Sequence, residues 1–276
     1  MKKTIAITGA TGGLGSLMVK DLAKDFDLVL VDRNINKSKA LAEDIKKVVP
    51  DAAIDFITCD LARFESVKSA VNALIGRDIH VLMLNSGVYN VPIFKCDTGY
   101  NNVFQINFVS QYYMARRMVE KSKSLEKVVI TSSVAHRYGS IDENDVDFST
   151  HAKSAKIYGN SKRFLTFALY EYFNNVSDKK LAVAHPGVTL TNMTNHYPKF
   201  INPIVKLAIK IFFPSPKKAI RSLLLAARED SCGYMEWIGP SVFDVWGKPK
   251  KSKLKSCTAD ESKSIARIAE RIYGDL

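Results

Sequence analysis

Six short apolar runs, separated by stretches with helical spacing, constrain the fold of this chain more than any other feature. They cover residues 4–7, 28–31, 53–58, 80–84, 127–131 and 181–184. Continuous apolar runs of this length are typical of strands buried on both faces of a parallel sheet. Strands that alternate with helices form right-handed βαβ units. The sequence therefore predicts an α/β fold over residues 1–276: a single-domain Rossmann-type doubly wound parallel sheet with helices on both faces.

A glycine-rich turn follows the first run, with the sequence Thr8-Gly9-Ala10-Thr11-Gly12-Gly13-Leu14-Gly15. Apolar residues then recur at helical spacing, at Leu14, Leu17, Met18 and Leu22. Glycines permit a tight turn close to a ligand, and a helix N-terminus offers free N–H groups to an anion. The pattern predicts a dinucleotide pyrophosphate site, although a plain strand-to-helix connection has a similar sequence.

The second run ends in Asp32, which lies about 20 residues beyond the glycines. An acid at this place accepts hydrogen bonds from a ribose and repels a 2′-phosphate. Arg33 works in the opposite direction, because an arginine there accommodates that phosphate, unless it is simply a solvated loop cation. Since Thr11 and Gly12 are not basic, the sequence favours NAD over NADP.

Small and polar residues follow the later runs, where a parallel sheet binds its ligands. They are Asp60-Leu61, Asn85-Ser86-Gly87, Ser132-Ser133 and Pro186-Gly187-Val188, with Thr191 soon after. Tyr158 and Lys162 are four residues apart in a long apolar segment, so they share one helix face.

In order and spacing, these residues resemble the short-chain dehydrogenase/reductase family over nearly the whole chain. The resemblance implies that Tyr158 is the acid/base of hydride transfer and that Lys162 stabilises its phenolate and binds the nicotinamide ribose. It also implies that Ser133 holds the substrate oxygen and that Asn107 anchors a water. The implied cofactor contacts are Gly9, Thr11, Gly13, Leu14, Gly15, Asp32, Arg33, Asp60, Leu61, Asn85, Gly87, Tyr158, Lys162, Pro186, Gly187, Val188 and Thr191.

Three of these positions admit another interpretation. Adjacent serines in an extended segment point to opposite sides, and the family pattern favours Ser133 over Ser132, which leaves Ser132 a structural role. Asn107 has the alternative of a buried amide bonded to helix backbone. Ser86 stands where the family most often has alanine.

Late segments resemble the retinol-dehydrogenase-like branch of the family, among them Phe213-Pro214-Ser215-Pro216 and Gly247-Lys248-Pro249. The resemblance implies an apolar substrate, such as a steroid-, retinoid- or other lipid-like alcohol or carbonyl compound. We expect a substrate lid at about 191–213. Its apolar part, 203–213, could instead be a core helix or a peripheral membrane contact through Lys206 and Lys210.

Composition narrows the remaining function classes. The net charge of +12 comes from dispersed lysines without interleaved aromatic residues, which argues against a nucleic-acid partner. Four scattered cysteines predict no metal site and a reducing, cytoplasmic location. No signal peptide precedes the first strand, and no apolar run is long enough to cross a bilayer.

A homo-oligomer, either a dimer or a tetramer, is expected from two helices that carry more apolar residues than one sheet-facing stripe requires. These residues are Tyr112, Tyr113, Phe164, Phe167, Leu169 and Phe173. A non-catalytic dinucleotide-binding sensor or scaffold is the alternative to the enzyme.

Overall fold

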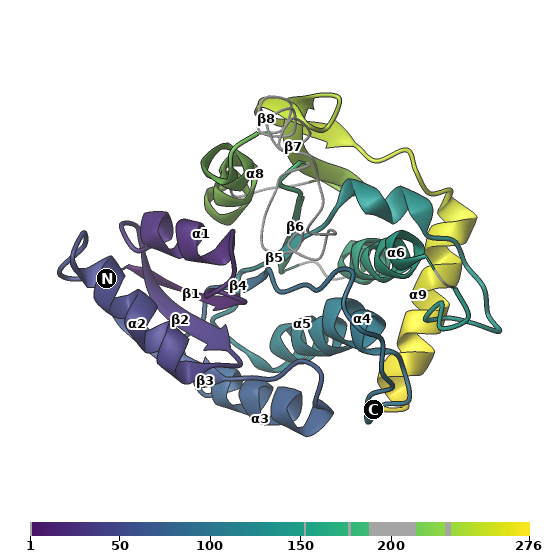
Figure 1. The fold of residues 1–276 in the computed structure, drawn as a ribbon, viewed down its shortest axis with the longest axis horizontal. Coiled ribbons are helices and arrows are strands. Elements are labelled where there is room, and N and C mark those ends of the chain that lie inside the picture. The colour runs from purple at the N-terminus through teal and green to yellow at the C-terminus, as the bar shows by residue number, and fades with distance from the viewer. Residues whose placement is uncertain (1, 152, 176–177, 188–213, 230–232) are drawn as a thin grey trace, which may run out of the picture.

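One eight-stranded sheet organises the computed structural model, which describes residues 2–151, 153–175, 178–187, 214–229 and 233–276 (Figure 1). The strand order is β3-β2-β1-β4-β5-β6-β7-β8, and all neighbours are parallel except β7 and β8. The bounds are β1 Lys3–Thr8, β2 Phe26–Asp32, β3 Ile54–Thr58, β4 Val81–Leu84, β5 Lys127–Thr131, β6 Lys180–Ala184, β7 Glu236–Val242 and β8 Trp246–Lys253.

The six expected strands are all present, and the α/β doubly wound fold is confirmed. Two strands were not predicted, because Gly239, Pro240 and Pro249 interrupt their patterns and lysines dominate β8. Pro240 and Pro249 lie opposite each other next to a register shift in this antiparallel pair. The expectation of a wholly parallel sheet is therefore corrected at one edge.

Helices cover both faces of the sheet. Their bounds are α1 Gly15–Leu22, α2 Ile35–Lys46, α3 Phe64–Ile75, α4 Asn102–Phe104, α5 Ser110–Lys121, α6 Ser154–Asn174, α8 Pro216–Arg228 and α9 Ala259–Gly274. Two further short elements lie in the described part of the chain: the π-helix η1, Gln105–Val109, and the 3₁₀-helix η2, Val134–Tyr138.

Successive residues of β1 point into different cores, as the pleat of a strand requires. Ile5 and Ile7 pack with residues of α1, α2 and α8, whereas Ala6 packs with residues of α3, α5 and α6. The sheet is thus buried on both faces, which explains why its central strands are continuously apolar.

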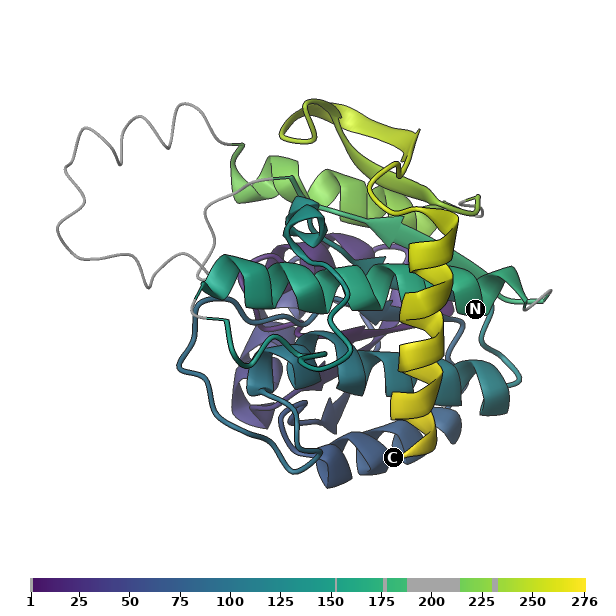
Figure 2. The same cartoon turned by 90° about the vertical axis from the view of Figure 1, so that its right-hand side faces the viewer.

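Helix α9 lies across α6 and against α5, as Figure 2 shows in yellow. Tyr112, Phe164, Phe167 and Leu169 are at most 2% exposed within a single chain. The Arg116 guanidinium lies 4.1 Å from the Tyr172 ring centre and 4.3 Å from that of Tyr273, and it pairs with Glu270 on α9.

Most of the apolar excess that suggested an oligomer is therefore buried inside the chain, with Tyr113 half-buried, so this excess does not support an oligomer. The oligomer itself stays a prediction. The expected lid at 191–213, with its alternatives at 203–213, lies outside the described residues. Among the helices that the structure describes, none combines the length and apolar character needed to cross a membrane.

Candidate active site

The carboxyl ends of β1, β4 and β5 are joined by Asn85, which follows β4. Its main-chain N–H donates to Thr8 Oγ1 at 3.0 Å, and its side-chain amide donates to the carbonyls of Thr8 and Gly9 at 3.2 Å each. Its Oδ1 accepts a hydrogen bond from Thr131 Oγ1 at 3.3 Å. Asn85 therefore fixes the edge at which the expected site residues gather.

The glycine turn after β1 leaves no room for side chains at two positions. Gly9 has a φ of +67°, and a Cβ there would lie 2.8 Å from Ser86 Oγ. A Cβ on Gly15 would lie 2.1 Å from the Gly9 carbonyl oxygen. Gly13 and Leu14 complete the turn, with Leu14 at the N-cap of α1. This close packing places the free N–H groups of α1 behind the turn, which suits a diphosphate.

Asp32 at the end of β2 is held by its neighbours and is 5% exposed. Its Oδ1 accepts from the N–H of Thr11 at 3.2 Å and from Thr11 Oγ1 at 3.0 Å, and its Oδ2 accepts from Ser38 Oγ at 3.1 Å. Burial raises the pKa of this carboxyl, while the bonds from Thr11 and Ser38 lower it. Oδ2 retains acceptor capacity for a ribose hydroxyl. Arg33, next in sequence, is exposed.

Tyr158 and Ser133 come together from α6 and the end of β5. Burial raises the pKa of the Tyr158 phenol to about 12, and a hydrogen bond with the Ser133 side chain acts in the opposite direction. Ser133 Oγ also accepts from the N–H of Ala135 at 3.2 Å. Ser132, in contrast, is buried and shares a 2.7 Å hydrogen bond with Thr166 Oγ1, in keeping with a structural role.

Lys162 brings a buried ammonium to the same place. Its Nζ donates to the Thr131 carbonyl at 2.8 Å and lies 6.0 Å from the centre of the Tyr158 ring. Burial lowers the pKa of Lys162 to about 8, so the group is mostly protonated at neutral pH. A positive charge at this distance favours the phenolate form of Tyr158.

Gly87 and Asn107 complete this group. A Cβ on Gly87 would lie 3.4 Å from Asn107 Oδ1 and 3.5 Å from Lys162 Nζ. Asn107, in the π-helix, accepts from the N–H of Val88 at 2.8 Å and donates to the Val88 carbonyl and to Ser161 Oγ at 3.0 Å each. Asn107 is therefore a buried amide that fixes main chain, and its water-anchoring role stays a prediction.

The other cofactor candidates lie at the ends of β3 and β6. Asp60 Oδ1 accepts from the N–H of Ala62, and the Leu61 carbonyl accepts from Ser110 Oγ at 2.7 Å, so this pair is tied to α5. After β6, Gly187 has a φ of +77°, and its N–H donates to His185 Nδ1 at 3.2 Å. Pro186 lies between these two residues. Val188 and Thr191 lie outside the described residues.

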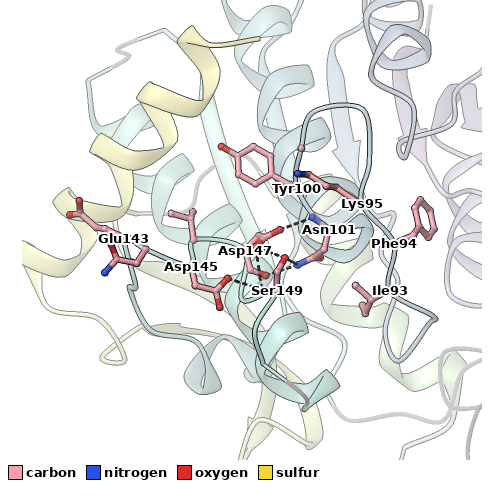
Figure 3. Close-up of a pocket in the computed structure, with 12 residues that line it drawn as sticks. Ile93, Phe94, Lys95, Tyr100, Asn101, Glu143, Asp145, Asp147 and Ser149 are labelled. Carbon is pink, nitrogen blue, oxygen red and sulfur yellow. Dashed lines mark hydrogen bonds between the residues drawn. The ribbon is translucent and has the colours of Figure 1, made fainter.

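A cavity of about 580 Å³ lies between residues 93–101 and 143–149 (Figure 3). The carboxylate of Asp147 accepts from the N–H of Asn101 at 2.6 Å and from Ser149 Oγ at 2.7 Å. The bond from Asn101 joins the two segments, and the bond from Ser149 holds the carboxylate within its own segment. None of the expected site residues lines this cavity, so it is separate from the site around Tyr158.

Two residues near the site were missed by the sequence interpretation. His136 is fully buried, and its Nδ1 lies 2.6 Å from the carbonyl oxygen of Ser133. Asp244, in the turn between β7 and β8, pairs with Arg137 and lies 3.6 Å from His185. For His136, the one signal in the sequence was its position three to four residues after Ser133 and Ser132. Asp244 lies in the β7–β8 hairpin, which was not expected.

Comparison with known proteins shows that this chain is similar to short-chain dehydrogenases, among them retinol dehydrogenases. The family model described as short chain dehydrogenase matches residues 3–201. Human retinol dehydrogenase 13 is 26% identical over 202 residues, which are 70% of this chain and 61% of that protein. This chain thus spans less than two thirds of that relative. Mouse retinol dehydrogenase 14 is 24% identical over 99% of this chain and 86% of its own.

Solved structures agree on the fold. An uncharacterized protein from Mycobacterium paratuberculosis superposes with a TM-score of 0.78 at 22% identity, covering 99% of this chain and 93% of its own. A short-chain dehydrogenase/reductase from Burkholderia phymatum in complex with NAD gives a TM-score of 0.59 at 18% identity, covering 83% and 87%. One from Sphingobium yanoikuyae in complex with NADPH also gives 0.59, at 19% identity, covering 83% and 85%.

Proposed function

Because the chain belongs to the short-chain dehydrogenase family and is an oxidoreductase acting on CH–OH donors, we propose that it interconverts an alcohol and a carbonyl compound with Tyr158 as acid/base. The observation that carries the proposal is the shared location of the Tyr158 phenol, the Ser133 hydroxyl and the Lys162 ammonium. These are the groups that such a proton transfer needs.

The described residues fit a nicotinamide dinucleotide. The turn from Gly9 to Gly15 suits the diphosphate, Asp32 suits the adenosine ribose, and Lys162 suits the nicotinamide ribose. A bound nicotinamide supplies the hydride acceptor for oxidation and the hydride donor for reduction.

The protein moves the accompanying proton. In oxidation Ser133 holds the substrate oxygen, and Tyr158 as phenolate takes the hydroxyl proton while the substrate carbon loses its hydride. The carbon–oxygen single bond becomes a carbonyl, and Tyr158 ends as the neutral phenol. Reduction runs the same steps backwards. Lys162 stabilises the phenolate by its charge.

An apolar substrate is supported by the surroundings of Tyr158. Tyr158 packs against a buried apolar cluster of Val103, Phe148 and Ile157, as Val88 and Val91 also do, and its ring centre lies 5.2 Å from that of Tyr89. Such walls suit a lipid-like alcohol better than a small polar one. Retinol dehydrogenases and the human polyprenol dehydrogenase, 25% identical over 80% of this chain and 71% of its own, have names that suggest the same class.

We also propose NAD as the preferred cofactor, because the Asp32 carboxylate faces the glycine turn and a 2′-phosphate would meet its charge. The exposed Arg33 is the feature that opposes this preference. A homo-oligomer, peripheral membrane contact and cytoplasmic location stay predictions.

The test is a screen of retinoid, steroid, polyprenol-type and short alcohols with NAD, followed by NADH absorbance. Tyr158→Phe should lower kcat by about 100-fold or more and leave NADH binding intact. Tyr138→Phe is the matched control, because this tyrosine is 62% exposed and lies on η2 close to the site. Tight NADH binding without turnover of any alcohol or carbonyl compound would instead support the sensor or scaffold.

A further inference from the structure

His136 is held between Ser133 and the C-terminal part of the chain. Its Nδ1 lies 2.6 Å from the Ser133 carbonyl oxygen, and its Nε2 lies 2.6 Å from Ser256 Oγ. The ring also packs edge-on against Phe167 and Trp237, with centres 5.7 Å and 5.2 Å away. No part of the side chain reaches solvent.

The partners fix the tautomer of this histidine. A carbonyl oxygen only accepts hydrogen bonds, so Nδ1 carries the proton and donates it to Ser133. Nε2 then accepts from the Ser256 hydroxyl. Burial lowers the pKa of His136 to about 4, and nearby Arg137, Arg163 and His185 act in the same direction. The ring is therefore neutral and has one orientation.

Arg163 extends the contact to α6 and α9. Its Nη1 donates to the carbonyls of His136 and Ser256, at 3.3 Å and 3.0 Å, and its Nη2 lies 2.5 Å from Glu261 Oε1. This arginine directly follows Lys162 in α6. The segment around Ser256 and the start of α9 are thus bound to the main chain that carries Ser133.

We propose that His136 is a positioning residue, which sets the place of the Ser133 hydroxyl for the substrate oxygen and for Tyr158, with Ser256 as the residue that orients His136. The proposal rests on the role given to Ser133 under the proposed function. Since Ser133 begins the turn into η2, a shift of its carbonyl also shifts its side chain. Displacements of about 1 Å can slow a reaction by about 100-fold.

Two substitutions of His136 separate hydrogen bonding from packing. His136→Asn keeps an amide donor at about the position of Nδ1 and should retain kcat within about threefold. His136→Gln places its amide near Nε2, loses the donor to Ser133, and should lower kcat about 10- to 100-fold. His80→Gln is the matched control, because His80 accepts from the N–H of Thr4 at the amino ends of the central strands β1 and β4, away from the site.

The pH profile adds a readout that a loss of stability would not move. The Ser133 hydrogen bond lowers the pKa of Tyr158. In the oxidation direction, His136→Gln should therefore shift the rise of kcat/KM to higher pH, whereas His80→Gln and His136→Asn should not. Equal impairment of the two His136 variants, or an unshifted profile in His136→Gln, would overturn the proposal.

Crystal structures of the two His136 variants test the same inference without turnover. Ser133 Oγ should be displaced in His136→Gln and unmoved in His136→Asn, and the reverse would refute the positioning role. A wild-type protein that turns over no alcohol and no carbonyl compound would refute the proposed function, while these structures would still decide on His136.

Discussion

Lys162→Met should stabilise the protein at neutral pH while abolishing its activity. The ammonium of Lys162 is buried, and the pKa falls from 10.5 to about 8 because burial disfavours the charged form. At neutral pH the folded protein therefore keeps a buried charge, and this charge lowers the free energy of unfolding. Methionine has a similar length and carries no charge.

The magnitude follows from the two pKa values. A depression from 10.5 to about 8 corresponds to about 3 kcal/mol of lost stability wherever Lys162 is charged in both states. The substitution also leaves the Thr131 carbonyl without its 2.8 Å donor, which costs about 1–3 kcal/mol. At pH 7 the variant should therefore be about 1 kcal/mol more stable than the wild type.

The sign of this difference should reverse with pH. Between about pH 8 and 10.5 the unfolded chain binds more protons at Lys162 than the folded chain, so wild-type stability rises with pH through this window. Above it the charge penalty is gone, and only the loss of the donor to Thr131 remains in the variant. Lys162→Met should then be about 2 kcal/mol less stable than the wild type.

Urea unfolding of both proteins from pH 6.5 to 10, without cofactor, measures this difference. Other titrating groups cancel when the two curves are subtracted. A free-energy difference that does not change with pH would refute the assignment of a depressed lysine pKa. The variant should also lose about 100-fold or more in kcat, and full activity would refute the role of Lys162.

Three further results are expected. The ratio of kcat/KM for NAD to that for NADP should exceed about 10 and should fall in Asp32→Ser, while equal use of both cofactors by the wild type would show that Arg33 dominates. Glu270→Gln should lower the unfolding free energy by about 1 kcal/mol at pH 7, because Arg116 and Tyr112 both bond to the half-exposed Glu270 carboxylate and glutamine keeps an acceptor but not the charge, and an unchanged urea midpoint would refute this contribution. Gly239→Ala should lower the melting temperature by several degrees, because its Cβ would lie 1.8 Å from His185 Nε2, and a normal melting curve would show that His185 can move.

The central strands and the chemistry at their ends could be predicted from the sequence because both depend on local signals. The run 28–31 is apolar because its strand is buried on both faces, and Tyr158 and Lys162 share a face because both lie in α6. The site residues follow from the topology, since the carboxyl ends of parallel strands meet at one edge.

The remaining features depend on contacts between distant segments, which no local pattern contains. Tyr112 bonds to Glu270, which lies 158 residues later in the sequence. Local periodicity therefore could not show that α9 packs over apolar residues of α5 and α6. His136 likewise meets Ser256, 120 residues away. The hairpin of β7 and β8 escaped notice because proline and lysine are poor strand formers, although both suit an edge.

The lysines of strand β8 contribute to the net charge of +12, and they affect how the sheet can contact other chains. An edge strand offers unpaired main-chain groups to any other strand, and lysines and prolines are the usual protection against such pairing. β8 carries Lys248, Pro249, Lys250, Lys251 and Lys253 within six consecutive positions. Two chains approaching through this edge would bring like charges together. We infer that these lysines keep the β8 edge of the sheet from pairing with strands of other chains, a purpose that requires neither nucleic acid nor lipid.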